Sequence, residues 1–187
     1  RRLLARVRDV MAGTDAADKR LDEVVRIIAS DMVAEVCSIY VRRAGEVLEL
    51  FATQGLKPNA VHQTRLKFGE GIVGDIAIKA RAFALAEAQE HPNFAYRPET
   101  GEEIYHSMMG VPVLRGGRVV GVIAVQNRTQ RNYTDEEIET LQTVAMVLAE
   151  LIAGGDLFRI TDGTDIDPET VRPVRLEGLM LNPGIGM

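Results

Sequence analysis

Residues 108–126 carry the sequence MMGVPVLRGGRVVGVIAVQ, and this stretch decides the fold class. Two apolar runs, 108–114 and 119–126, flank the turn Arg115-Gly116-Gly117-Arg118. A Gly-Gly pair supplies the positive φ angles that a two-residue hairpin turn needs. A tight hairpin makes its two strands antiparallel, because parallel strands require a crossover of a dozen or more residues. The stretch therefore predicts an antiparallel hairpin, and with it an antiparallel sheet.

A second hairpin is predicted earlier in the chain. Residues 36–41 (VCSIYV) and 47–53 (VLELFAT) are separated by Arg43-Ala44-Gly45-Glu46, which has the composition of a turn. Both faces of 47–53 carry apolar residues, which is typical of a strand covered at least partly on both sides. Residues 62–68 alternate polar and apolar side chains and predict an edge strand, and 82–86 predict a short extended piece.

Four helices are predicted around these strands. Apolar residues recur at helical spacing in 3–11 and again in 21–32, and Asp15 or Asp18 can cap the second of these helices. Residues 72–80 predict a helix of barely two turns. Thr134 and Glu137 form a capping box that begins a long helix with two apolar stripes, one for the sheet and one for another helix. This order of elements predicts an α+β sandwich.

Composition and charge exclude several classes of protein. The chain is 46% hydrophobic, so a domain of about 150 residues can bury a core. The formal net charge of −5 argues against a nucleic-acid partner, because phosphate backbones attract a basic surface. No apolar run approaches the length of a membrane helix, which argues against a membrane partner. The single cysteine, Cys37, excludes an internal disulfide, so we expect a cytoplasmic protein.

The glycines of Gly69-x-Gly71-x-x-Gly74 match a dinucleotide-binding fingerprint in form only. The strand before them alternates polar and apolar residues, whereas the parallel core strand of such a fold is almost wholly apolar. The helix after them is too short to cross over the sheet. We interpret the glycines as residues that allow a tight turn and a close approach of helix to sheet.

No catalytic or metal-binding pattern emerges from the remaining residues. His62, His91 and His106 are spaced by 29 and 15 residues and form no metal-ligand motif, so hydrogen bonding at the surface or a pocket rim is the default. Cys37 lies inside a predicted strand and is interpreted as a small core residue. We therefore expect no cofactor and no metal, and we predict that the chain is not itself an enzyme.

The long irregular segment 87–107 is the best candidate for contact with a ligand. Long loops in compact domains are usually functional, and this one combines aromatic residues with charges. An alternative, compatible with the first, is that the aromatic residues pack the loop onto the sheet. The predicted ligand-binding residues are His91, Phe94, Tyr96, Arg97, Glu102, Glu103 and Ser107.

Five motifs in order resemble those of a GAF domain. They are VCSIYV at 36–41, GEGIVG at 69–74, SMMGVPV at 107–113, GVIAV at 121–125 and YTDEE at 133–137. The resemblance covers about residues 1–154. It implies a central antiparallel sheet of five to six strands with helices on both faces. Other GAF domains bind cyclic nucleotides, tetrapyrroles or haem, but a covalent bilin requires a loop cysteine, and Cys37 lies in the first strand.

Two further segments resemble a narrower family. Residues 91–103 (HPNFAYRPETGEE) with Tyr105-His106-Ser107 resemble the N-terminal GAF domain of the nitrogen-related phosphotransferase-system enzyme I, a phosphoenolpyruvate–protein phosphotransferase. Residues 176–186 (LEGLMLNPGIG) resemble the opening strand of that family's phosphohistidine domain. We therefore expect a GAF sensor domain in 1–154, and in 155–187 a linker with the truncated start of the next domain.

This resemblance implies a regulatory domain in nitrogen signalling, with glutamine as the expected effector and a phosphocarrier protein as the partner of the missing domains. None of the three histidines lies in the family's phosphohistidine motif, so no catalytic residue is carried over. The apolar stripes in 3–11 and 138–152 suit a homodimer formed through the terminal helices. The alternative is a module that dimerises or docks a protein without a ligand, its pocket filled by side chains such as Met108, Met109 and Met146.

Overall fold

The computed structural model of the protein describes residues 2–92, 105–155 and 157. In these ranges six strands form one antiparallel sheet in the order β3-β2-β1-β6-β5-β4. The α+β class and the central antiparallel sheet are confirmed. The strands are β1 (Val36–Arg43), β2 (Val47–Gln54), β3 (Arg65–Lys67), β4 (Phe83–Leu85), β5 (Ser107–Arg115) and β6 (Arg118–Asn127).

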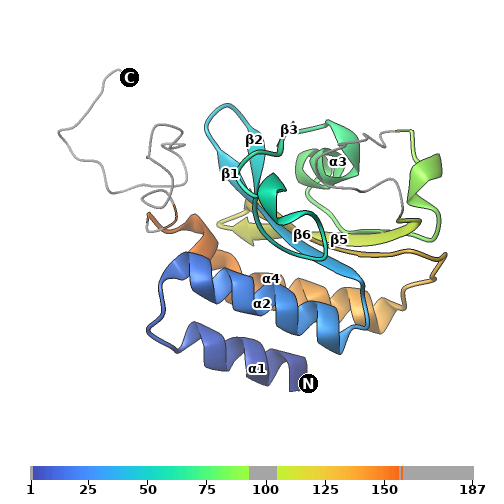
Figure 1. Cartoon of the computed structure of the whole chain (residues 1–187). Coiled ribbons are helices and arrows are strands. Elements are labelled where there is room, and N and C mark those ends of the chain that lie inside the picture. The colour runs from blue at the N-terminus through green and yellow to red at the C-terminus, as the bar shows by residue number, and fades with distance from the viewer. Residues whose placement is uncertain (1, 93–104, 156, 158–187) are drawn as a thin grey trace.

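Helices cover both faces of this sheet, as predicted. Figure 1 shows α1, α2 and α4 layered on one face, which we call the helical face, and α3 on the opposite face, which we call the α3 face. Each face has its own cluster of buried apolar side chains. The helices are α1 (Arg2–Met11), α2 (Ala17–Asp31), α3 (Gly71–Lys79) and α4 (Asp135–Ala153), with short 3-10 helices η1 (Pro58–Ala60) and η2 (Ala88–Glu90).

Both predicted hairpins are present, and their strands are slightly longer than predicted. Gly116 and Gly117 have φ angles of 59° and 80°, so the Gly-Gly turn joins β5 to β6 in the conformation that the sequence predicts. The register of β1 with β2 shifts between Ile39 and Tyr40. At this β-bulge no residue of β1 lies opposite Phe51. The side chains of Phe51 and Ala52 therefore both point to the helical face.

The predicted start of α4 is confirmed, and the predicted start of α2 is wrong. The Thr134 hydroxyl accepts from the Glu137 amide and the Glu137 carboxylate accepts from the Thr134 amide, which completes the capping box. The residue at the N-cap of α2 is Ala16, and no side chain caps this helix. Asp18 lies inside the first turn of α2, where its carboxylate accepts from the Lys19 amide.

The two apolar stripes of α4 contact different partners, as predicted. One stripe, which includes Leu141 and Leu148, is buried against β5 and β6. The other helix in contact with α4 is α1, which also packs on α2. The edge strand β3 is only three residues long because 61–63 form a turn, in which His62 has a φ angle of 68°.

The glycines next to α3 bring this helix unusually close to the sheet. A Cβ atom on Gly74 would lie 2.5 Å from the Lys67 carbonyl oxygen and 3.0 Å from the Gly69 nitrogen. On the sheet side, a Cβ atom on Gly110 would lie 2.5 Å from Cδ1 of Ile76. Gly69 and Gly71 take φ angles of 89° and 70° in the turn before the helix. The interpretation of these glycines as turn and close-approach residues is confirmed.

One charged cluster lies within the sheet, centred on Glu49 of β2. Glu49 is opposite Val41, so its side chain points to the helical face, and it is fully buried. Its carboxylate accepts from Nε of the buried Arg43 at 3.1 Å and from Nη2 of Arg65 at 2.9 Å, and it also contacts His62. Glu49 therefore supplies the negative charge that the buried Arg43 guanidinium faces.

Replacing Gly74 with alanine tests the close approach of α3. Alanine usually stabilises a helix by about 0.4–1 kcal/mol relative to glycine. Here the added methyl group meets backbone atoms, so we expect Gly74→Ala to lower the free energy of unfolding by about 1–3 kcal/mol. Gly155→Ala is the control, because nothing lies within 4 Å of its Cβ position. Urea unfolding of both variants measures the effect, and a stabilised Gly74→Ala would contradict the packing described.

Replacing Glu49 with alanine tests the buried charge cluster. Removing one partner of a buried ion pair costs about 3–5 kcal/mol, since the other charge stays buried. The control is Arg65→Ala, because Arg65 is 42% exposed and loss of an exposed pair costs about 1 kcal/mol or less. Equal unfolding free energies for the two variants in urea would show that burial does not set the strength of this cluster.

Candidate functional site

His91 lies on the α3 face, beside Asp75 of α3 and Phe83 of β4. This residue follows η2, and its amide donates to the Ala88 carbonyl at 3.0 Å. Its ring lies 6.0 Å from that of Phe83 in β4, and its Nε2 lies 3.6 Å from Oδ2 of Asp75 in α3. Of the seven predicted ligand-binding residues, His91 is the one that the structure places on this face.

Asp75 is the buried charge of this site. Its side chain is 4% exposed, although α3 is otherwise an apolar helix. Lys79, one turn further along, places its Nζ 3.4 Å from Oδ2 and 5.5 Å from the centre of the Phe83 ring. Among the described residues, Oδ2 accepts no hydrogen bond. We refer to Asp75, Lys79 and His91 as the Asp75 cluster.

Backbone contacts fix the chain around the Asp75 cluster. The Ala88 amide donates to the carbonyl of His106, so η2 lies beside the residue that leads into β5. The His106 ring contacts Glu87 at 2.9 Å, and Glu87 also accepts from Gln130. Tyr105 is buried in the apolar core of the α3 face, with its hydroxyl 3.5 Å from the Gly55 carbonyl. These contacts hold residues 88–91 and 105–107 next to one another.

Ser107 lies on the other face of the sheet. Its neighbour Met108 packs in the core of the α3 face, so the Ser107 side chain points to the helical face. There its hydroxyl donates to the Thr129 carbonyl at 2.9 Å and lies 3.1 Å from the Tyr133 hydroxyl. The side chains of Ser107 and His91 therefore lie on opposite faces of the sheet, although their backbone segments are neighbours, and we leave Ser107 out of the candidate site.

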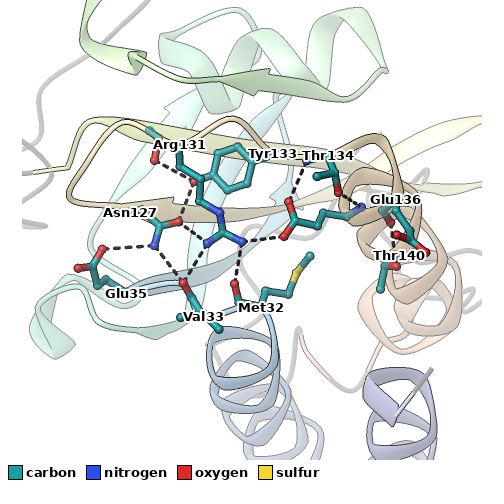
Figure 2. Close-up of polar contacts among 11 residues, drawn as sticks. Met32, Val33, Glu35, Asn127, Arg131, Tyr133, Thr134, Glu136 and Thr140 are labelled. Carbon is teal, nitrogen blue, oxygen red and sulfur yellow. Dashed lines mark hydrogen bonds and ion pairs between the residues drawn. The ribbon is translucent and has the colours of Figure 1, made fainter.

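Ser107 belongs to a hydrogen-bond network on the helical face that continues through Tyr133 to Asn127 (Figure 2). Burial raises the pKa of Tyr133, whose hydroxyl donates to Oδ1 of Asn127 at 2.9 Å. Arg131 donates to the same Oδ1 and to the carbonyls of Met32 and Val33 at the end of α2. These bonds satisfy carbonyls that a helix end leaves without partners.

Arg131 also reaches the start of α4. Its Nη2 donates to Oε2 of Glu137 at 2.8 Å, and its guanidinium lies 4.8 Å from the centre of the Tyr133 ring. Partial burial opposes ionisation of Glu137, but hydrogen bonds from Thr134 and Arg131 outweigh it and lower the pKa. Arg131 thus ties the end of α2 to the beginning of α4, a structural role that the sequence patterns did not reveal.

The other five predicted ligand-binding residues lie outside the described ranges. They are Phe94, Tyr96, Arg97, Glu102 and Glu103. Their role stays a prediction.

The three histidines lie beside carboxylates, and the cysteine lies in the core. Each histidine contacts one carboxylate: His62 contacts Glu49, His91 contacts Asp75 and His106 contacts Glu87. Within residues 2–92 and 105–155, no three potential ligands cluster in a way that could hold a metal ion. Cys37 is buried in the core of the helical face, where burial raises the pKa of its thiol, so it is the small core residue predicted.

The three methionines proposed to fill a pocket occupy three different environments. Met108 is buried in the core of the α3 face, and Met109 is buried under the helical face. Met146 is 74% exposed on α4. Only Met108 therefore lies where it could fill space beside the Asp75 cluster.

A groove of about 640 Å³ lies on the helical face, between the α1–α2 connection and the end of β2. Asp9, Asp15, Asp22 and Glu23 line it together with Lys19 and Arg26. Burial and the nearby Asp18 raise the pKa of Asp22, while Lys19 and His62 oppose this shift. The groove contains none of the predicted site residues.

Sequence reasoning missed Asp75, although a signal for it is present. The helix sequence GIVGDIAIK at 71–79 contains one acidic residue among apolar neighbours. A charged residue in such a helix is either exposed to water or buried beside partners, since burying a charge without partners is costly. Its burial became visible only with the packing of α3 on the sheet.

No helix in the described part of the chain has the length and apolar character needed to cross a membrane.

Comparison with known proteins places the chain among regulatory domains. The family model for the GAF domain matches residues 16–152. A protein of the phosphoenolpyruvate-dependent phosphotransferase system from Escherichia coli (strain K12) is 32% identical over 190 residues, which cover 99% of this chain and 24% of that protein. The Nif-specific regulatory protein of Azospirillum lipoferum is 28% identical over 138 residues, 71% of this chain and 22% of that protein. The chain thus spans about a quarter of the curated relatives that it matches.

Solved structures support the same assignment. The GAF domain of a phosphoenolpyruvate–protein phosphotransferase from Coxiella burnetii is similar with a TM-score of 0.75 and 31% identity, over 86% of this chain and 95% of that one. The corresponding Acinetobacter domain gives a TM-score of 0.72 and 29% identity, over 82% and 94%. The part of such a phosphotransferase that this chain resembles is a regulatory module and not the catalytic part, as predicted. By fold, motifs and family model together, the chain belongs to the GAF domain family.

Proposed function

We propose that the chain is the small-molecule-sensing GAF domain of a phosphoenolpyruvate–protein phosphotransferase in nitrogen signalling, and that it responds to an amino acid such as glutamine. The observation that carries this proposal is the similarity to two kinds of protein at once. One kind is a phosphotransferase-system protein and the other is a regulator whose name refers to nitrogen fixation genes. A domain shared by both is suited to report nitrogen status to different outputs.

The α3 face is the proposed place of binding. Ligand sites in proteins combine apolar walls with a few placed polar groups. On this face Phe83, Tyr105 and Met108 supply apolar surface, and the Asp75 cluster supplies a carboxylate, an ammonium and an imidazole. The predicted contacts Phe94, Tyr96, Arg97, Glu102 and Glu103 are proposed to serve the same ligand.

The proposed output lies on the opposite face. The terminal helices α1 and α4 pack together there, and we propose that they also form the interface of a homodimer, with the phosphocarrier protein bound by other domains of the full-length protein. Met146 is an exposed apolar residue on α4 that such an interface would cover. A ligand that binds one state better than another would shift the helices toward that state.

The second candidate function is a GAF module that dimerises or docks a protein partner without a ligand. The burial of Met108 favours it, because a methionine packed on the α3 face occupies volume that a ligand would otherwise use.

Calorimetric titration of the purified domain separates these two functions. We expect glutamine, or another amino acid in a panel that also contains 2-oxoglutarate and cyclic nucleotides, to bind with a measurable heat and to raise the melting temperature. Cyclic nucleotides are the control, because their negative phosphate would meet the buried carboxylate of Asp75. A folded sample that gives no heat with any member of the panel would reject sensing and favour the ligand-free module.

A further inference from the structure

Asp75 has an environment that costs free energy in the absence of a ligand. Its side chain is 4% exposed and lies among apolar residues of α3 such as Ile72 and Ile76. Its Oδ2 accepts no hydrogen bond from the part of the chain that the structure describes. Almost all buried polar groups in proteins have a hydrogen-bond partner, and a buried carboxylate is more costly to leave without one than a neutral group. The fold itself gains nothing from this arrangement.

The two basic side chains near Asp75, Lys79 and His91, do not remove that cost. Lys79 Nζ and His91 Nε2 lie 3.4 Å and 3.6 Å from Oδ2, whereas a charge-assisted hydrogen bond to a carboxylate is about 2.7–2.9 Å long. The Lys79 side chain is 53% exposed, so water screens much of its attraction. The Lys79 ammonium faces the charge of Asp75, but neither Lys79 nor His91 is close enough to satisfy Oδ2 with a short hydrogen bond.

The order of charges in the cluster matches one class of small molecule. A carboxylate flanked at 3.4 Å by the Lys79 ammonium and at 3.6 Å by Nε2 of the His91 ring complements a ligand in which an ammonium and a carboxylate are joined through a single carbon. That arrangement is the zwitterion of an α-amino acid. The ammonium would donate to the unsatisfied Oδ2, and the ligand carboxylate would face Lys79 and His91.

We propose that the Asp75 cluster binds the α-ammonium and α-carboxylate groups common to amino acids. The inference rests on the proposed sensing function and deepens it, because it names the groups of the ligand that this face recognises. Binding exchanges the long contacts of Asp75 with Lys79 and His91 for short ones with the ligand ammonium. His91, the residue directly after η2, then leaves Asp75 for the ligand carboxylate, so occupancy of the site changes the position of the His91 side chain.

The apolar surroundings strengthen this recognition. Charges attract one another more strongly where water is excluded, and the Asp75 carboxylate is buried against the core of the α3 face. The aromatic ring of Phe83, which lies beside both Lys79 and His91, presents a negative face to a cation. A molecule without an ammonium group has no positive charge to place against the Asp75 carboxylate, so the site selects for a ligand that carries one.

The test compares glutamine with two analogues and one variant. Glutaramic acid lacks the α-ammonium group of glutamine, and 4-aminobutanamide lacks the α-carboxylate. Titration of the wild-type domain should give affinities for both analogues that are roughly 10- to 100-fold lower than for glutamine, the worth of one charged hydrogen bond. The same pair of truncations applies to whichever amino acid of the panel binds most tightly. These measurements need no variant and hence do not depend on how a variant folds.

The variant Asp75→Asn tests whether Asp75 is the residue that recognises the ligand ammonium group. The variant should lose roughly 10- to 100-fold in affinity for glutamine and should no longer distinguish glutamine from glutaramic acid, because the partner of the ammonium is gone. Its melting temperature should not fall, since the oxygen that changes accepts no hydrogen bond. Asp22→Asn, on α2 at the helical face, is the matched control and should leave the affinity unchanged.

The outcomes separate this inference from the proposed function. If glutamine binds but glutaramic acid binds equally well, or if Asp75→Asn keeps wild-type affinity, the zwitterion site is overturned while sensing stands. If no amino acid of the panel binds to the folded wild-type domain, sensing and the zwitterion site are both rejected. Loss of affinity both when the ligand ammonium is removed and when the Asp75 charge is removed supports sensing and the zwitterion site.

Discussion

The close approach of α3 to the sheet is the constraint on which the candidate site depends. Gly74 lets the helix lie against the Lys67 carbonyl, and Gly110 lets Ile76 press on β5. A helix held that near the strands leaves no water around the side chains on its inner surface. The carboxylate of Asp75 is thereby buried, and Lys79 is left one turn away near the rim. Gly74, the last glycine of the formal nucleotide-binding fingerprint, thus helps to bury a negative charge, which disfavours a phosphate ligand.

On the helical face, a hydrogen-bond network joins the end of a strand to the ends of two helices. Arg131 donates to the carbonyls of Met32 and Val33 just after α2, to Asn127 at the end of β6 and to Glu137 at the start of α4. Through Asn127 and Tyr133 this network includes Ser107, the first residue of β5. Figure 2 shows how α2, β6 and α4 meet at this guanidinium. Because η2 is hydrogen-bonded to His106, a change at His91 has a short covalent and hydrogen-bonded route to the helical face.

Local patterns in the sequence predicted the elements whose causes are local. The Gly116-Gly117 turn and the Thr134 capping box each depend on a few adjacent residues, and both are present. The start of α2 was mispredicted because Asp15 and Asp18 are good caps, yet the chain places Ala16 at the cap position. The roles of Asp75 and Arg131 were not predicted, because they come from contacts between distant segments. The face to which Ser107 points depends on the register of β5, which no local pattern fixes.

A crystal structure of the domain grown with glutamine would show whether Asp75 receives the ammonium group of an amino acid. We expect the ligand nitrogen to lie within about 3 Å of an Asp75 carboxylate oxygen, the ligand carboxylate to face Lys79 or His91, and His91 no longer to contact Asp75. Glutamine bound elsewhere on the domain, with Asp75 still 3.4 Å from Lys79 and 3.6 Å from His91, would contradict this expectation.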